Sequence, residues 1–179
     1  MKTSKRYHAL DVFRGMTIAL MILVNTPGSW AYVYSPFRHA QWHGLTLTDL
    51  VFPFFLFIVG TALMFSFSKY NFCRTKEVYQ KIAKRTAIIF LIGLLGHLYG
   101  TLVHGKAFEN FRIMGVLQRI ALCYGIAAVL VLRFKIQHLW IILIAVLIGY
   151  WQLLLWNGGY SLETNFARTV DIAILGASH

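Results

Sequence analysis

The stretch DLVFPFFLFIVGTALMFSFS, residues 49–68, decides the fold. Asp49 opens it, and the nineteen residues that follow contain no Lys, Arg, Asp or Glu. A helix of about 20 mostly apolar residues is long enough to cross the hydrocarbon core of a bilayer. Four further apolar blocks occur, at about 12–32, 86–103, 114–132 and 138–156. We therefore predict an all-α fold, a polytopic transmembrane helix bundle with about five spans in this chain.

The overall composition agrees with a membrane protein. Hydrophobic residues make up 58% of the chain and the mean hydropathy is +0.63, whereas a soluble domain is typically about 45–50% apolar. The first block lacks a small-residue cleavage site, so we interpret it as a retained span and not as a signal peptide. Cys73 and Cys123 form no CxxC motif. We therefore expect neither a disulfide nor a metal site.

The distribution of basic residues predicts the orientation. The net charge is +11, from 17 Lys and Arg against 6 Asp and Glu. Eleven of the 17 lie before the first block, between the second and third, and between the fourth and fifth, while four lie on the opposite side. Arg14 and Arg119 fall inside blocks. This bias is typical of membrane topology and not of nucleic-acid binding, and it predicts a cytoplasmic N-terminus.

Polar and aromatic side chains gather just before the second block, on the side predicted to be external. His39, Trp42 and His43 precede Thr46 and Asp49. Histidine is a common general base near neutral pH, and a carboxylate often orients it, so these residues could handle protons. Alternatively, the T-x-x-D pattern of Thr46 and Asp49 only caps the next helix, while the rings lie at headgroup level. The residues alone leave both interpretations open.

Ionisable and amide side chains within the first block are further candidates. Asp11 and Arg14 are three residues apart and share a helix face, so they form either an ion pair or a site where Arg14 holds a cytoplasmic anion. Asn25 follows Arg14 by eleven residues, on the same face and about 16 Å further along the helix. Asn25 is either a structural hydrogen-bonding group near a helix end or a donor that polarises a developing oxyanion.

Gln118 and Arg119 lie near the outer edge of the fourth block. A buried arginine needs an anionic partner, for which Asp49, predicted at a similar depth, is the first candidate. A structural salt bridge between helices is the simpler interpretation. Three other features are expected to be structural: His97, His104 and the GxxxG pattern at Gly96 and Gly100, which favours close helix packing.

Three segments carry a resemblance to a known family. LDVFRGMTIALMILVN (10–25), HAQWHGLTLTDLVFPFFLFIVG (39–60) and RIMGVLQRIALCY (112–124) resemble the heparan-alpha-glucosaminide N-acetyltransferase family and its bacterial homologues. The segment NFARTVDIAILGASH (165–179) resembles the opening of that family's next section. The chain is similar to the N-terminal half of such a protein, so we expect it to be truncated at the C-terminus.

The resemblance implies an acyltransferase that moves an acetyl group from cytoplasmic acetyl-CoA to an amino sugar on the far side of the membrane. It places the catalytic histidine of the H-A-x-W motif at His39 and a catalytic asparagine at Asn25. Animal members often have W-N-G where this chain has Trp42-His43-Gly44, so the resemblance does not carry a catalytic role to His43. Acetyl-CoA is the implied donor substrate, with no metal.

The predicted site combines the residues with the resemblance. His39, Asn25 and Asp49 are predicted to be catalytic, with Asp49 setting the His39 tautomer. Donor-binding and acceptor-binding residues are predicted as follows: Arg14, Arg119 and Gln118 for acetyl-CoA, and Trp42 and His43 for the sugar. The expected partners are the lipid bilayer of a bacterial inner membrane, the two substrates and a homodimer partner. A membrane carrier for amino sugars such as N-acetylglucosamine is the alternative function, and an inactive fragment is another.

Overall fold

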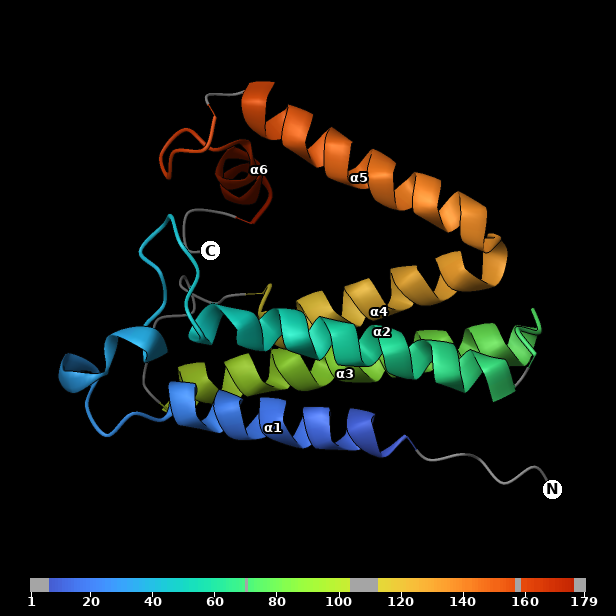
Figure 1. The fold of residues 1–179 in the computed structure, drawn as a ribbon, viewed down its shortest axis with the longest axis horizontal. Helices are drawn as coiled ribbons and strands as arrows, with labels where there is room; N and C mark the ends of the chain where they lie inside the picture. The colour runs from blue at the N-terminus through green and yellow to red at the C-terminus, as the bar shows by residue number, and fades with distance from the viewer. Residues whose placement is uncertain (1–6, 70, 104–112, 157–158, 176–179) are drawn as a thin grey trace. The chain divides into compact units, whose positions relative to one another are not determined.

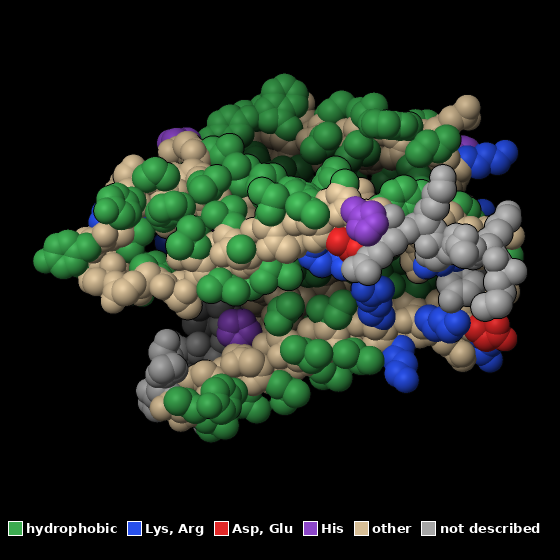
Figure 2. All heavy atoms as spheres, turned by 60° about the horizontal axis from the view of Figure 1, so that its bottom comes forward, with side chains coloured by type: hydrophobic (Ala, Val, Ile, Leu, Met, Phe, Trp, Pro, Cys, Tyr) green, Lys and Arg blue, Asp and Glu red, His purple; other side chains and the backbone are tan. Residues whose placement is uncertain are grey.

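The structure is a computed structural model that describes residues 7–69, 71–103, 113–156 and 159–175. These residues form helices and loops with no β-strand, which confirms the all-α prediction (Figure 1). The chain divides into two compact units, residues 1–69 and 70–179. Hydrophobic side chains cover much of the surface seen in Figure 2, as expected for helices that face lipid.

The first unit is a helix pair joined by a long loop. Its helices are α1 (His8–Asn25) and α2 (Val51–Lys69), and the loop contains three short 3₁₀ turns, η1 (Trp30–Tyr32), η2 (Ser35–Phe37) and η3 (Thr48–Leu50). The Phe13 ring of α1 packs edge-on against Phe54 and Phe57 of α2, with centroid distances of 5.2 and 6.1 Å. Aromatic pairs of this kind stabilise contacts beyond simple area burial, so they align the two helices.

The second unit contains α3 (Lys76–Val103), α4 (Val116–Arg133), α5 (Ile136–Trp156) and α6 (Phe166–Leu175). Helices α3 and α4 approach closely at Gly93, where an added Cβ would lie 2.8 Å from both the Gln118 Oε1 and the Leu117 Cβ. An added Cβ at Gly96 or Gly100 meets no described atom within 4 Å. The prediction that Gly96 and Gly100 allow close helix packing is therefore wrong within the described chain. Gly93 allows the close approach of α3 and α4 instead.

Five helices of the described chain are long and apolar enough to cross a membrane: His8–Asn25, Thr48–Lys69, Lys76–Val103, Val116–Arg133 and Ile136–Trp156. The predicted number of spans is confirmed. Two boundaries were wrong. The first helix ends at Asn25 and not near residue 32, because Pro27 and Gly28 stop it. The third helix begins at Lys76, ten residues before the predicted apolar block. Its first turns are basic, so hydropathy did not mark them although they are helical.

Helix α6 was not predicted, because residues 157–179 were interpreted as a polar stretch. Its start carries a recognisable signal. The Asn165 Oδ1 accepts a hydrogen bond from the backbone N–H of Ala167, at 2.8 Å. Asparagine is a favoured N-cap residue because its side chain satisfies an amide of the first turn.

Candidate active site

The loop between α1 and α2 holds His39 through its neighbour Arg38. The Arg38 Nε donates to the backbone carbonyl of Val33 at 2.8 Å, and its Nη2 donates to that of Ala31 at 3.0 Å. These two bonds fold the loop back onto itself. Gly44 then turns the chain with a φ of +120°, a conformation that side-chain-bearing residues rarely adopt. His39 is thus presented on a braced segment of backbone.

His39 and Asp49 form the central pair of the site. The His39 Nδ1 lies 2.6 Å from the Asp49 Oδ1. A carboxylate only accepts hydrogen bonds, so Nδ1 carries a proton, and in the neutral form of the ring this tautomer has its lone pair on Nε2. The His39 side chain is 70% exposed. The structure therefore brings together the predicted base and its orienting carboxylate, with Nε2 free of that contact.

The second oxygen of Asp49 is fixed by three donors. Asp49 Oδ2 accepts from the Thr46 backbone N–H at 3.0 Å, from the Thr46 hydroxyl at 2.8 Å and from the Ala40 N–H at 3.3 Å. A capping box contains two reciprocal hydrogen bonds, and the T-x-x-D pattern predicted one here. The bond from the Thr46 amide to Asp49 is one of these two bonds. Capping and orientation are therefore not alternatives, because Asp49 uses one oxygen for each.

Asn25 is the last residue of α1, and its side chain bonds within its own helix. Its Nδ2 donates to the Met21 carbonyl at 2.8 Å. No hydrogen bond joins Asn25 to His39 or Asp49 in the described part of the chain. Its second amide hydrogen and its side-chain oxygen have no partner among the described residues. The bond to Met21 fits the helix-end interpretation. A catalytic role for Asn25 stays a prediction.

Arg14 lies in a cavity at the other end of the helix pair. Its Nη1 lies 3.8 Å from the Asp11 Oδ1, so the predicted ion pair is present. Binding of a cytoplasmic anion by Arg14 stays a prediction. Arg14 also lines a cavity of about 220 Å³ together with Ser66 and Lys69. Tyr7 and Phe65 form one wall, with their rings stacked at 4.1 Å. The sequence did not identify Ser66 and Lys69, because only the packing of α1 on α2 brings them to Arg14.

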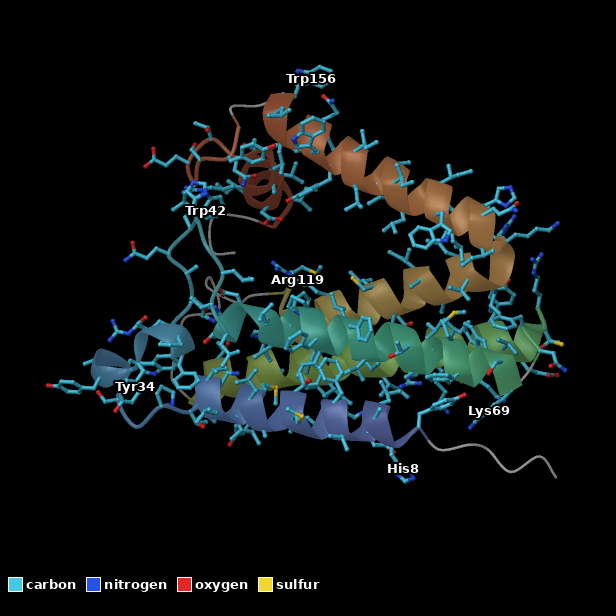
Figure 3. The ribbon with its side chains drawn as sticks, in the orientation of Figure 1. His8, Tyr34, Trp42, Lys69, Arg119 and Trp156 are labelled. Carbon is cyan, nitrogen blue, oxygen red and sulfur yellow. The ribbon has the colours of Figure 1, made fainter. Side chains whose placement is uncertain are left out.

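Gln118 and Arg119 line a separate cavity of about 360 Å³ at the start of α4. The Gln118 side chain is fully buried, and its Oε1 accepts from the Gly115 N–H at 3.1 Å. Arg119 is exposed on the first turns of the helix (Figure 3). Its predicted pairing with Asp49 joins residues of different units and stays a prediction, as does donor binding by Gln118 and Arg119.

The other predicted residues lie elsewhere in the described chain or fall outside it. Trp42, labelled in Figure 3, and His43 are exposed in the loop before α2, with ring centroids 6.4 Å apart. His97 lines the cavity at the start of α4. His104 lies outside the described residues. Among the described residues, no three His, Cys, Asp or Glu side chains are grouped to hold a metal ion.

Comparison with known proteins assigns the family. A family described as "Heparan-alpha-glucosaminide N-acetyltransferase, catalytic" matches residues 6–174. The chain belongs to this family. It is 38% identical over 131 residues to the heparan-alpha-glucosaminide N-acetyltransferase of Homo sapiens, in a match that covers 72% of this chain and 19% of the human protein. The corresponding protein of Mus musculus is 36% identical over 130 residues, with the same coverage.

The resemblance stated from the motifs is thereby confirmed. The chain spans about a fifth of the length of these relatives. Together with the five apolar helices, the family identifies a multi-pass membrane protein. The match includes the His39–Asp49 pair, the Arg14 cavity and the start of α4.

Proposed function

We propose that this chain forms part of a transmembrane acetyltransferase, which moves an acetyl group from cytoplasmic acetyl-CoA to an amino sugar on the opposite side of an inner membrane. The oriented His39–Asp49 pair, inside a segment matched by an N-acetyltransferase family, is the observation that carries this proposal. The bias of basic residues supports a cytoplasmic N-terminus and an external His39 loop.

In this proposal His39 moves a proton during acyl transfer. As the neutral amine nitrogen attacks the thioester carbonyl, His39 Nε2 takes the proton that the nitrogen loses. The C–S bond breaks, and the imidazole returns the proton to the CoA thiolate. The available amide hydrogen of Asn25 would stabilise the carbonyl oxygen as it gains negative charge. Trp42 and His43 would contact the sugar.

A covalent route uses the same imidazole. Nε2 attacks the thioester carbonyl, the C–S bond breaks, and the acetyl group passes from Nε2 to the amine, whose proton ends on the CoA thiolate. Incubation of the protein with radiolabelled acetyl-CoA, without acceptor, distinguishes the routes. Only the covalent route leaves labelled protein, and the label would then leave on addition of an amino sugar.

The Arg14 cavity fits the donor end of this scheme. Arg14 and Lys69 supply two positive charges and Ser66 a hydroxyl, while Asp11, which also lines the cavity, offsets one of the charges. The net positive charge and the hydroxyl suit phosphate oxygens. The stacked rings of Tyr7 and Phe65 offer an apolar wall beside them. Arg14 and Asn25 are separated by about 16 Å along α1. A pantetheine arm can cover that distance, so CoA phosphates at Arg14 would leave the thioester near the outer end of the helix.

Acetyl transfer by the whole chain in lipid vesicles tests the proposal, with labelled acetyl-CoA and a panel of amino sugars. His39→Ala should abolish transfer, whereas His138→Ala, which removes a histidine of α5, should not. Absence of CoA binding and of acetyl transfer in the unsubstituted chain would contradict the proposal. Amino-sugar uptake that survives His39→Ala would support the carrier instead.

A further inference from the structure

Basic side chains gather at one end of the second unit, where α3 begins, α4 ends and α5 begins (Figure 1). Residues 71–85 and 133–138 contain seven Lys and Arg against one acidic residue, Glu77. All seven are exposed: Arg74, Lys76, Lys81, Lys84, Arg85, Arg133 and Lys135. Like charges in one region repel one another, so this end of the unit favours a bound anion.

A hydrogen bond joins two segments of this region that are far apart in the sequence. The Arg74 Nη2 donates to the backbone carbonyl of Arg133 at 3.1 Å. Arg133 is the last residue of α4, where carbonyl groups lack partners within the helix. The bond uses one of the several N–H donors of a guanidinium, so Arg74 can still bind an oxygen anion. Arg74 therefore lies against the segment that carries Arg133 and Lys135, and these three residues are called the basic cluster below.

Exposed aromatic rings accompany the basic cluster. Phe134 lies between Arg133 and Lys135 and is 39% exposed. Phe72, two residues before Arg74, is 40% exposed and has a φ of +53°, a conformation that is rare for a bulky residue. Exposure of apolar rings to water is unfavourable. A ligand that also has an apolar part would cover them.

The apolar surface continues along α5. Its first residue, Ile136, follows Lys135 directly, and Ile136, Trp140 and Ile141 are all exposed. No residue of α5 is buried, and tryptophan is enriched where membrane helices meet the headgroups. A free phosphate would meet only the cations, whereas a phospholipid would also cover these side chains. The continuity of charge and apolar surface therefore favours a lipid.

We propose that the basic cluster binds the headgroup of an anionic phospholipid. The lipid phosphate lies against Arg74, Arg133 and Lys135, and the acyl chains run along the first turns of α5. A net negative headgroup complements the charge of the cluster, whereas the choline of a zwitterionic lipid would bring a further cation to it. The site does not depend on acetyl transfer. The orientation proposed above places it in the cytoplasmic leaflet.

Competition between two lipids tests the site. The whole chain is purified in detergent with equal amounts of phosphatidylglycerol and phosphatidylcholine that have the same acyl chains, and native mass spectrometry counts the lipids that stay bound. We expect an excess of phosphatidylglycerol, because each basic residue near an anionic headgroup strengthens binding about fivefold. Arg133→Gln and Lys135→Gln should each lower the excess by about this factor, whereas Arg168→Gln, which removes an arginine of α6, should leave it unchanged.

Two substitutions of Arg74 separate its charge from its bond to α4. Glutamine and lysine side chains can both donate to the Arg133 carbonyl, but only lysine keeps the positive charge. Arg74→Gln should therefore lower the excess of phosphatidylglycerol about fivefold, and Arg74→Lys should preserve it. An equal loss in both variants would contradict binding through charge.

Equal retention of the two lipids by the unsubstituted chain would overturn the proposal, as would a preference that survives the replacement of all three cluster residues by glutamine. Soluble competitors identify the source of the anion. If an excess of glycerol 3-phosphate or of CoA displaced the bound phosphatidylglycerol, the cluster would bind a soluble phosphate and the assignment to a lipid would be wrong.

Discussion

Asp49→Asn should disable His39, although asparagine has the same shape as aspartate and can stay in contact with the ring. The environment of Asp49 Oδ2 contains two backbone N–H groups, from Thr46 and Ala40, which can only donate. A substituted asparagine must therefore place its oxygen there, because its NH₂ would face two donors. The NH₂ then faces the His39 Nδ1 and forces that atom to accept, which moves the ring proton to Nε2. The base loses the lone pair that the reaction requires.

The size of the effect follows from the two backbone amides. The opposite orientation of the substituted side-chain amide would leave both backbone N–H groups unsatisfied, at about 1–1.5 kcal/mol each, towards the lower end of the usual range. A total of about 3 kcal/mol leaves the productive tautomer populated at roughly one part in 100. We therefore expect acetyl transfer to fall about 100-fold, with donor binding unchanged.

Two measurements on the Asp49→Asn protein check this reasoning. The first is the rate of acetyl transfer, with Asp171→Asn as a control that removes a carboxylate of α6. The second is the ¹⁵N NMR spectrum of the histidine rings, which reports the tautomer directly. Retention of activity within a few-fold of the parent, or a His39 ring still protonated at Nδ1, would refute the argument.

Three further perturbations test other parts of the structure. Gly93→Ala should lower the free energy of unfolding by about 1–3 kcal/mol because its methyl group overlaps α4, whereas Gly96→Ala should not; thermal unfolding in detergent measures both. Arg14→Gln should weaken CoA binding about tenfold through loss of a charged hydrogen-bond donor, as calorimetry would show. In intact cells an impermeant maleimide should label Leu45→Cys and leave the native Cys73 unlabelled, and the reverse pattern would invalidate the proposed topology.

The sequence predicted the features that depend on local pattern. Span number follows from apolar block length, and the Asp11–Arg14 and Thr46–Asp49 contacts follow from a spacing of three residues. The His39–Asp49 bond was one of two open interpretations, because a separation of ten residues does not by itself bring two side chains together. The observed loop does so through Arg38, whose bonds to backbone carbonyls have no sequence signature.

Features that depend on packing could not be predicted. Which glycine of α3 meets α4 depends on the rotation of both helices about their axes, and the pattern pointed to Gly96 and Gly100 instead of Gly93. The cavity that contains Arg14 needs residues of α2, which approach it only after α2 packs on α1. The basic first turns of α3 were missed because hydropathy measures membrane contact and not helicity.

The separation of only ten residues between His39 and Asp49 has a consequence for biogenesis. Every group that orients the imidazole belongs to one short, continuous piece of chain, from the loop after α1 to the 3₁₀ turn that leads into α2. During synthesis this piece is complete as soon as the second helix leaves the ribosome. The His39–Asp49 pair can therefore form before the later helices are inserted.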